Sequence, residues 1–324
     1  MNRVSAAICI TLLATCGAMA ETRAAGEADV FACPVIEDPE VLAERLAELI
    51  EKKWDRQEMS CGAGYGYQLA LLSPDDIELK LAALGAQIAY LDALGRQYPR
   101  LYQAGELGRE LGVEWRATGE RGEALLQDLD RLEPAPAEAS ILKAAFLLAS
   151  VAQEASVQEE FAAIPPALQS LERGIESNPE ALDGLGLMML GRLRIALPVF
   201  SGGNVDEAVE LLEKGIEVAP ESIEMHRWMV EAYLARRDNA RAVEVLASAA
   251  NLGGADINPQ DLADILVDLG GLAFRLEQPA LNEKFRQRRQ ALLLERPYLL
   301  QRKSTAKLGH GGVDPLTGQD PNEL

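Results

Sequence analysis

Side chains that act as bases, nucleophiles or metal ligands are scarce in this sequence. Its 324 residues include two histidines, His226 and His310, and four cysteines. With so few histidines, the sequence has no zinc-protease motif and no plausible serine–histidine–aspartate pattern. We predict that His226 packs between two helices, and we assign no metal to His310. The sequence therefore favours a binding protein over an enzyme, with no cofactor and no metal site.

Two further patterns in the sequence involve residue types that can do chemistry. Cys61-Gly62-Ala63-Gly64-Tyr65-Gly66 is rich in glycine, but no strand precedes it and its spacing departs from the dinucleotide-binding fingerprint. We predict a flexible turn there. Carboxylates are abundant throughout, yet no pair is singled out as a general acid and base. An enzyme remains the least favoured of the function classes.

The composition indicates a helical, acidic protein. There are 51 Asp and Glu residues against 31 Lys and Arg residues, giving a formal net charge of −20. This charge argues against nonspecific binding to nucleic acid or to an anionic membrane. Leu, Ala, Glu and Arg favour helices, and no run of alternating β-branched and polar residues indicates a strand. The expected fold class is all-α.

The N-terminus has the pattern of an export signal. A short basic start at Met1-Asn2-Arg3 precedes an apolar run, and Ala18-Met19-Ala20 fits the small-x-small cleavage rule before Glu21. The apolar run is too short to span a bilayer, so no transmembrane span is predicted. Leu13-Ala14-Thr15-Cys16 also resembles a lipobox, which leaves a lipoprotein anchored at Cys16 as the alternative. We predict residues 1–20 as a signal peptide and a periplasmic or secreted location.

The cysteines beyond the signal form one pair. Cys33 and Cys61 are an even number of thiols in a chain predicted to enter an oxidising compartment. A disulfide between them would close a loop over the first predicted helix. Two buried free thiols are the alternative. A redox-active pair is disfavoured because the sequence has no Cys-x-x-Cys motif.

Helix boundaries are well signalled in the first half. Asp38-Pro39-Glu40 and Ser73-Pro74-Asp75-Asp76 each combine a capping residue, a proline and early acids, so each predicts a helix start. Between 101 and 132 many glycines interrupt the pattern, and two short helices are predicted. Residues 138–156 predict a strongly apolar helix. Ile164-Pro165-Pro166 is expected to open the next unit.

An internal repeat is the most informative feature of the second half. Three segments carry small residues seven positions apart with a leucine between them. Ala208 and Ala242 stand 34 residues apart, which is the tetratricopeptide period. Small residues allow one helix of a pair to approach the other, and leucine fills the gap. The three segments are Ala167, Leu171, Gly174 and Pro179; Ala208, Leu212, Gly215 and Pro220; and Ala242, Leu246, Ala249 and Gly254.

These residues resemble the tetratricopeptide-repeat (TPR) family over about residues 160–255. The best unit places helix A at 223–236 and helix B at 239–251, with Arg237-Asp238 as the turn. Pro198 interrupts what would be another helix A. The resemblance implies a degenerate TPR-like α-solenoid in which the inner face of helix A binds a partner.

A second resemblance covers about 15 residues. Ala196-Leu197-Pro198-Val199-Phe200-Ser201-Gly202-Gly203-Asn204, followed by Val205-Asp206-Glu207-Ala208, is similar to the Gly-Gly turn before a helix in the T-component of TRAP transporters. That family comprises exported helical proteins with cryptic TPR units. The resemblance implies a periplasmic protein that partners a transporter's solute-binding subunit.

The helix A face in the best unit supplies the candidate binding residues. Glu224, Arg227, Glu231 and Leu234 recur at helical spacing and are predicted to lie on that face. Arg227 would pair with a carboxylate of a protein or peptide partner. The alternative is an Arg–Glu pair within the helix itself, which contributes little to stability.

The C-terminal region differs in charge from the rest. Residues 275–307 hold nine basic and three acidic side chains. Homo-oligomerisation against an acidic surface, docking of an acidic partner and a solvated helix face are all compatible with this pattern. Two helices, from Asn258-Pro259 to Glu277 and from Pro279 to Arg296, are expected to cap the repeats. The tail 301–324 is predicted to be disordered.

Together these patterns predict four regions: a signal at 1–20, a helical N-terminal region at 21–160, TPR-like repeats and capping helices at 161–300, and the tail. The expected function is a periplasmic helical-repeat adaptor that presents a groove or pore to a protein or a small solute. Partnering a transporter's solute-binding subunit is the sharpest form of this hypothesis. A scaffold for envelope assembly is the second hypothesis.

Overall fold

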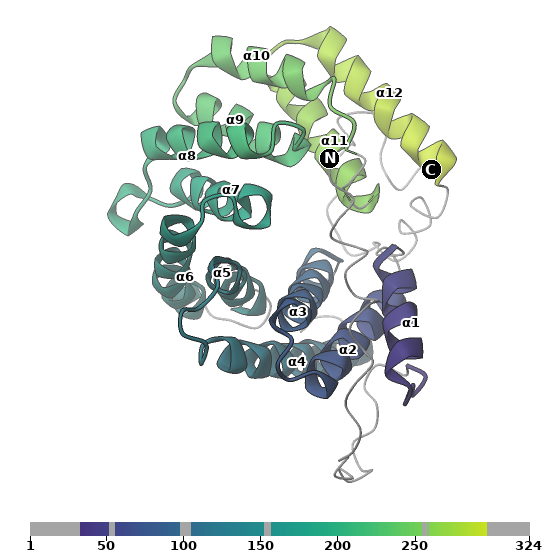
Figure 1. Ribbon diagram of the computed structural model, residues 1–324. Coiled ribbons are helices and arrows are strands. Elements are labelled where there is room, and N and C mark those ends of the chain that lie inside the picture. The colour runs from purple at the N-terminus through teal and green to yellow at the C-terminus, as the bar shows by residue number, and fades with distance from the viewer. Residues whose placement is uncertain are drawn as a thin grey trace. The chain divides into compact units, whose positions relative to one another are not determined.

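The computed structural model describes residues 33–51, 56–97, 105–151, 157–254, 257 and 259–296. The predicted signal, Cys16, His310 and the tail 301–324 lie outside these residues. The described residues form twelve α-helices and a short 3-10 helix without any strand (Figure 1). The all-α prediction is therefore confirmed. None of these helices is long and apolar enough to cross a membrane.

Contacts within the chain divide it into two compact units, 1–167 and 168–324. The division falls inside α6 (Val157–Ser177). Whether 21–160 is a separate domain stays a prediction. Unit 1 also contains α1 (Pro39–Glu51), α2 (Arg56–Leu72), α3 (Ile77–Gln97), α4 (Gly105–Leu129) and α5 (Ala137–Val151). Unit 2 contains α7 (Ala181–Ala196), η3 (Val199–Ser201), α8 (Val205–Val218), α9 (Ile223–Ala235), α10 (Asn239–Ala249), α11 (Pro259–Arg275) and α12 (Pro279–Glu295).

Helix α3 is at the centre of unit 1 and packs against α2, α4 and α5. Its buried residues, including Leu84, Tyr90 and Leu91, join one apolar core with residues of those three helices. Helix α1 begins as predicted, because the Asp38 carboxylate accepts a hydrogen bond from the Glu40 amide at 2.9 Å. It packs against α2, and the predicted disulfide between Cys33 and Cys61 joins the segment before α1 to α2.

Four boundary predictions in this half are wrong. The glycine-rich segment 61–66 lies inside α2, not in a turn, because its side chains pack against neighbouring helices. Residues 105–129 form one helix instead of two short ones, since the glycines in it are tolerated by tertiary packing. Helix α3 begins at Ile77 with Asp76 as its cap, after a turn at Pro74. Helix α6 begins at Val157, upstream of the two prolines.

Unit 2 is built from three helical hairpins, α7/α8, α9/α10 and α11/α12. The first helices of the hairpins are neighbours, because α9 contacts both α7 and α11 (Figure 1). The best predicted repeat is confirmed: helix A is α9, helix B is α10, and Arg237 makes the turn with a φ of 65°. This arrangement is the helix–turn–helix stacking of an α-solenoid.

The repeated small residues occupy the helix–helix contacts, as the spacing predicts. Ala208, Leu212, Ala242, Leu246 and Ala249 are all fully buried. Gly215 of α8 shows why a small residue is needed, since a Cβ there would lie 2.6 Å from the Met225 sulfur on α9. Asn204, Ser222 and Asp238 cap α8, α9 and α10, each accepting a backbone N–H at 3.2 Å.

Candidate functional site

The four predicted binding residues lie on α9 at spacings of three and four residues, and so share one side of the helix. Charged side chains of α7 and α11 meet them there. We call this surface the A-helix face, because α7, α9 and α11 are the first helices of the three hairpins. It comprises Arg192, Glu224, Arg227, Trp228, Glu231, Asp261, Asp268 and Arg275.

Arg227 joins α9 to α11. Its Nη2 lies 2.7 Å from Oδ2 of Asp268, and its side chain is only 17% exposed, whereas that of Asp268 is 48% exposed. The pair therefore bridges two repeats. Asp268 occupies one nitrogen of the Arg227 guanidinium, Nη2.

Trp228 gives this face an aromatic centre that the sequence did not single out. The guanidinium carbon of Arg227 lies 4.1 Å from the centroid of the Trp228 ring, and that of Arg192 lies 4.8 Å from it. A guanidinium over an indole contributes about 0.5–1 kcal/mol at an exposed site and about 2 kcal/mol when desolvated. Two cations on one ring fix the indole between α7 and α9.

Glu224 is held in an unfavourable environment for a carboxylate. Burial raises the pKa of Glu224 above its usual value, and the nearby Asp261 raises it further, while Arg227 and Arg192 lower it. The net effect is a raised pKa, so burial outweighs the attraction of the two guanidinium groups. The folded state then binds a proton at this carboxylate more readily than the unfolded chain does.

We expect Glu224→Gln to raise the melting temperature at pH 7. The raised pKa means that wild-type stability falls as the pH rises from the unfolded value, near 4.5, through the folded value. Glutamine removes this penalty at pH 7, and the gain should vanish below about pH 4.5, where wild-type Glu224 is protonated. Thermal unfolding of both proteins between pH 4 and pH 8 measures the difference. A lower melting temperature for the variant at pH 7 contradicts the assignment.

The other predicted residues, Glu231, Leu234 and His226, make fewer contacts with the neighbouring helices of this face. Glu231 lies 3.8 Å from Arg275 of α11, through Oε1 and Nη1, so it extends the charged row. Leu234 is partly buried and packs against the core of unit 2. His226 is buried, and its Nδ1 lies 2.9 Å from the Ser222 carbonyl oxygen, which can only accept a hydrogen bond. His226 is thus a packed side chain with a local partner.

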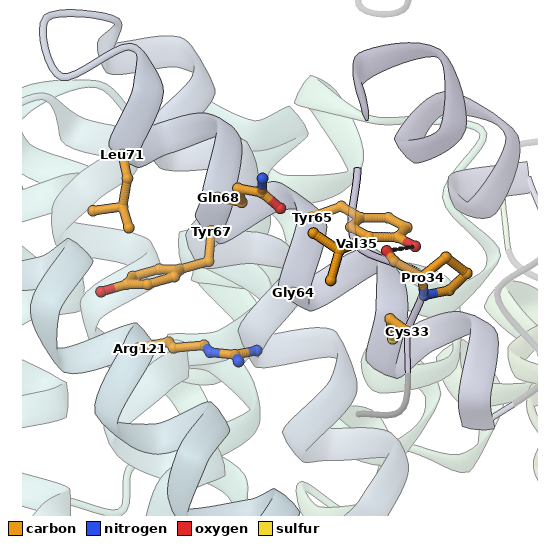
Figure 2. A pocket seen from close by; sticks show the side chains of 9 residues that line it. All are labelled: Cys33, Pro34, Val35, Gly64, Tyr65, Tyr67, Gln68, Leu71 and Arg121. Atoms are coloured by element: carbon orange, nitrogen blue, oxygen red, sulfur yellow. Dashed lines mark hydrogen bonds between the residues drawn. The ribbon is translucent and has the colours of Figure 1, made fainter. Parts of the chain in front are cut away.

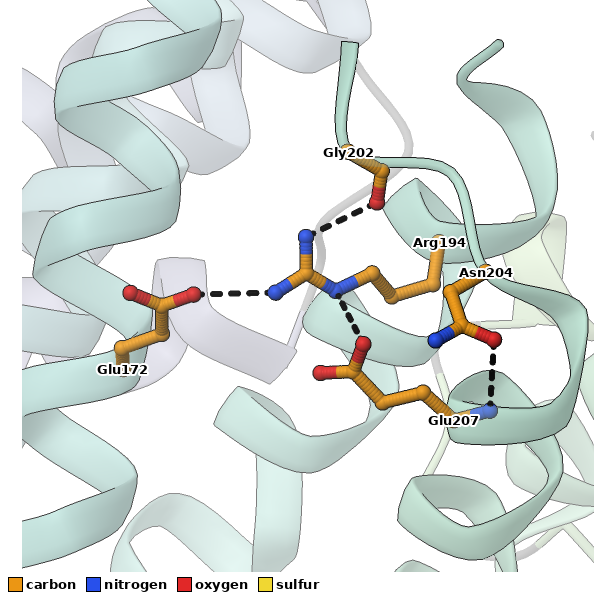
Figure 3. Close-up of polar contacts among 5 residues, drawn as sticks. All are labelled: Glu172, Arg194, Gly202, Asn204 and Glu207. Atoms are coloured by element: carbon orange, nitrogen blue, oxygen red, sulfur yellow. Dashed lines mark hydrogen bonds and ion pairs between the residues drawn. The ribbon is translucent and has the colours of Figure 1, made fainter. Parts of the chain in front are cut away.

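A second feature of unit 2 is the turn between α7 and α8. Figure 3 shows Arg194 of α7 at the centre of three polar contacts, with a side chain that is only 12% exposed. Its guanidinium donates to the Gly202 carbonyl at 2.8 Å, lies 2.9 Å from Glu172 of α6, and lies 3.1 Å from Glu207 of α8. One side chain therefore joins α6, the turn and α8.

This turn presents two large apolar side chains to solvent. Val199 and Phe200 of η3 are 87% and 89% exposed. The backbone beneath them is fixed, because Gly202 and Gly203 donate to the Val199 and Pro198 carbonyls at 3.2 and 2.9 Å. Neighbouring exposed apolar residues on a fixed turn are typical of an interaction site.

We expect Arg194→Met to destabilise unit 2 by about 1–2 kcal/mol. The variant leaves the Gly202 carbonyl without its donor and removes two charge-assisted contacts, which are discounted because both glutamates are partly exposed. Urea unfolding measures the change. Arg236→Met is the matched control, since its ion pair with Asp206 is exposed and should contribute under about 0.5 kcal/mol. Equal losses from both variants would contradict the role given to Arg194.

Several residues of the basic C-terminal region have partners inside unit 2. Arg288 of α12 donates to carbonyls at the C-terminal end of α10 and just beyond it, with Nη1 at 3.3 Å from Ala249 O and Nη2 at 2.5 Å from Leu252 O. Lys284 donates to Asn251 at 2.7 Å, and Arg286 pairs with Glu283 within α12. A cation at the C-terminal end of a helix is favourable. Arg288 thus joins the α11/α12 hairpin to α10.

Comparison with known proteins gives one family match. The tetratricopeptide repeat family matches residues 200–275, which run from η3 to the end of α11. No curated protein matches the chain. The match supports a TPR-like protein, and TPR repeats indicate a role in protein interaction or scaffolding. Within the described ranges, no group of three or more His, Cys, Asp and Glu side chains is placed to hold a metal ion.

Proposed function

We propose that this protein is a helical-repeat adaptor that binds an extended segment of a protein partner across the A-helix face. The observation that carries the proposal is Trp228 with two guanidinium groups on its ring, at the centre of three adjacent first helices. Tryptophan and arginine are the residues that most often dominate binding energy at protein interfaces. The tetratricopeptide match covers α9 and α11 of this face, and it supports a protein partner.

The charges of this face fit a partner segment that carries a carboxylate. The Arg227 guanidinium lies over the Trp228 ring and makes one ion pair, with Asp268, whose side chain is half exposed. A carboxylate of the partner would replace Asp268 on the guanidinium, where a bidentate contact is available. Glu224 and Asp261 on the same face would repel a wrongly placed acid, so the face would select where along the segment the carboxylate lies.

The proposal also names a cellular compartment and a kind of partner. The predicted signal at 1–20 and the Cys33–Cys61 disulfide support a periplasmic or secreted protein. The resemblance of residues 196–208 to the T-component of TRAP transporters, and the exposure of Val199 and Phe200 in that turn, favour a transporter's solute-binding subunit as the partner. An envelope-assembly scaffold is the second hypothesis, and the identity of captured partners decides between them.

Affinity capture with the full-length tagged chain from an envelope fraction tests the proposal. Wild type and Arg227→Glu are compared by quantitative mass spectrometry. Arg241→Glu is the matched control, because Arg241 is an exposed arginine of α10, outside the A-helix face. We expect partners bound through the face to fall about 10-fold or more with Arg227→Glu and to be retained with Arg241→Glu.

The variant Asp268→Asn is expected to have the opposite effect on partner binding. It removes the charge that pairs with Arg227 and leaves the guanidinium in place, so binding of the partner should be kept or strengthened. Circular dichroism of each variant establishes that unit 2 is still helical. Retention of the same partners by folded Arg227→Glu would overturn the proposal.

A further inference from the structure

Unit 1 presents a group of aliphatic side chains to solvent beside the segment that precedes α1. Val35 of that segment is 81% exposed, and Leu71 near the end of α2 is 53% exposed. Leu72, the last residue of α2, is 52% exposed, and Ile77, the first residue of α3, is 38% exposed. We call these four residues the aliphatic rim. Neighbouring exposed apolar side chains mark interaction surfaces, whereas single scattered ones do not.

The part of the rim before α1 is held against α2. Figure 2 shows Val35 and Leu71 on either side of one surface pocket, which both residues line. The carbonyls that flank Val35, those of Pro34 and Ile36, each accept a hydrogen bond of 2.9 Å from a side chain of α2. The disulfide of Cys33 adds a third tether to the same helix. This wall is therefore fixed before a ligand binds, which lowers the entropic cost of binding.

The part of the rim between α2 and α3 faces the same region. A hydrogen bond of 3.1 Å from the Asp76 amide closes the turn that Leu72 and Ile77 flank. Leu79, in the first turn of α3, packs against the same buried cluster as Ile36. The start of α3 is thereby brought alongside the segment before α1, so the four rim residues belong to one region of the surface.

Acidic side chains flank the rim on both sides. Residues 35–41 and 71–78 contain six carboxylates and no Lys or Arg. The bases that follow in the sequence, Arg45 and Lys80, pair with Glu48 and Asp128 instead. Among the residues that the structure describes, no Lys or Arg forms an ion pair with any of the six, and all six are exposed. They are Glu37, Asp38, Glu40, Asp75, Asp76 and Glu78.

Helix capping accounts for only part of this charge. Asp38 accepts a hydrogen bond from the Glu40 amide and Asp76 accepts one from the Leu79 amide, both at 2.9 Å. A cap requires one side chain per helix start, whereas α1 and α3 each begin with three acids. The like charges repel one another. A ligand that carries cations relieves this repulsion, and one that carries carboxylates increases it.

The cation of Arg121 limits where a ligand can place its own charges. Arg121 of α4 lines the pocket together with Tyr67, and its guanidinium carbon lies 5.8 Å from the centroid of that ring. A second cation at this point would be repelled. The basic side chains of a ligand therefore belong over the starts of α1 and α3, and its apolar side chains on the rim.

We propose that the aliphatic rim and the six carboxylates bind a segment of a partner protein in which large apolar side chains are flanked by lysine or arginine. Burial of the rim supplies affinity. The charges orient the segment and make its association fast and dependent on salt. This surface is in unit 1 and does not involve the A-helix face, so either proposal can fail without the other.

Fluorescence anisotropy with a labelled synthetic peptide tests the surface. The probe is an amphipathic peptide of leucine and lysine, and its matched counterpart has glutamate in place of every lysine. We expect the oxidised full chain to bind the lysine peptide about 10-fold or more tightly than the glutamate peptide. Equal binding of the two peptides would overturn the proposal.

Two apolar variants locate the binding of the lysine peptide. Leu71→Ser combined with Leu72→Ser should weaken it about 10-fold, because two leucines no longer contribute apolar surface. Leu294→Ser is the matched control, since Leu294 is an exposed leucine of α12 in unit 2, and it should change binding less than about 2-fold. Unchanged binding in the double variant, shown by circular dichroism to be folded, would contradict the proposal.

Two charge variants separate this surface from general attraction to an acidic chain. Asp75→Asn combined with Glu78→Gln removes two of the six carboxylates and keeps both caps. Glu210→Gln combined with Glu217→Gln removes two exposed carboxylates of α8 and gives the same net charge. We expect the first pair to weaken binding of the lysine peptide about 3-fold or more and the second to leave it unchanged. Equal losses from both pairs would refute the site.

Discussion

Replacing Gly203 with alanine is expected to destabilise unit 2 by about 3 kcal/mol, within the upper range for forced overpacking. A Cβ at Gly203 would lie 1.8 Å from the Leu197 carbonyl oxygen and 3.0 Å from the Pro198 carbonyl carbon. Both are backbone atoms, so no side chain can move aside to relieve the clash. The turn itself is fixed by hydrogen bonds from the Gly203 amide to Pro198 and from the Asn204 amide to Arg194, each 2.9 Å long.

Urea unfolding of wild type and Gly203→Ala measures this loss. Gly271→Ala is the matched control, because Gly271 lies inside α11 and a Cβ there has nothing within 4 Å. That variant should gain about 0.5–1 kcal/mol from helix propensity alone. If both substitutions changed the free energy of unfolding in the same direction, the clash at Leu197 would not be the controlling effect.

Loss of the disulfide is the second large effect. We expect Cys33→Ala with Cys61→Ala to lower the stability of unit 1 by about 3–4 kcal/mol, because the bond closes a loop with a sequence separation of 28 and restricts the unfolded chain. The loss should appear in urea unfolding as a lower midpoint. The same shift is expected when wild type is unfolded in the presence of dithiothreitol.

The double variant supplies its own control for this experiment. Without Cys33 and Cys61, dithiothreitol should leave the midpoint unchanged. A wild-type midpoint that does not respond to the reductant would show that the bond contributes nothing to folding.

The sequence predicts unit 2 better than unit 1 for a physical reason. In a repeat protein the same contact between two helices recurs at a fixed sequence interval. The spacing of Ala208 and Ala242 therefore indicates which face of each helix is buried and that this face packs against the other helix of its hairpin. Local capping residues such as Ser222 and Asp238 then fix the boundaries within a few residues. In unit 1 the glycines of α2 and α4 argue locally against helix, and contacts distant in sequence override them.

The candidate site was predictable only along a single helix. Periodicity places Glu224, Arg227 and Glu231 on one side of α9. It does not reveal that Arg227 meets Asp268, because that contact depends on the register between α9 and α11. The two guanidinium groups on Trp228 were missed for the same reason, since Arg192 comes from the preceding hairpin. The sequence did contain one signal for this cluster, which is the adjacent pair Arg227 and Trp228 on a predicted helix A.

Fluorine NMR of the full chain labelled with 5-fluorotryptophan tests the central claim most directly. The chain has three tryptophans, and Trp228→Phe and Trp115→Phe identify the signals of unit 2 and unit 1. Adding an unlabelled captured partner should shift or broaden the Trp228 signal and leave that of Trp115 in place. A Trp228 signal that stays unchanged in a chain saturated with partner would contradict binding across the A-helix face.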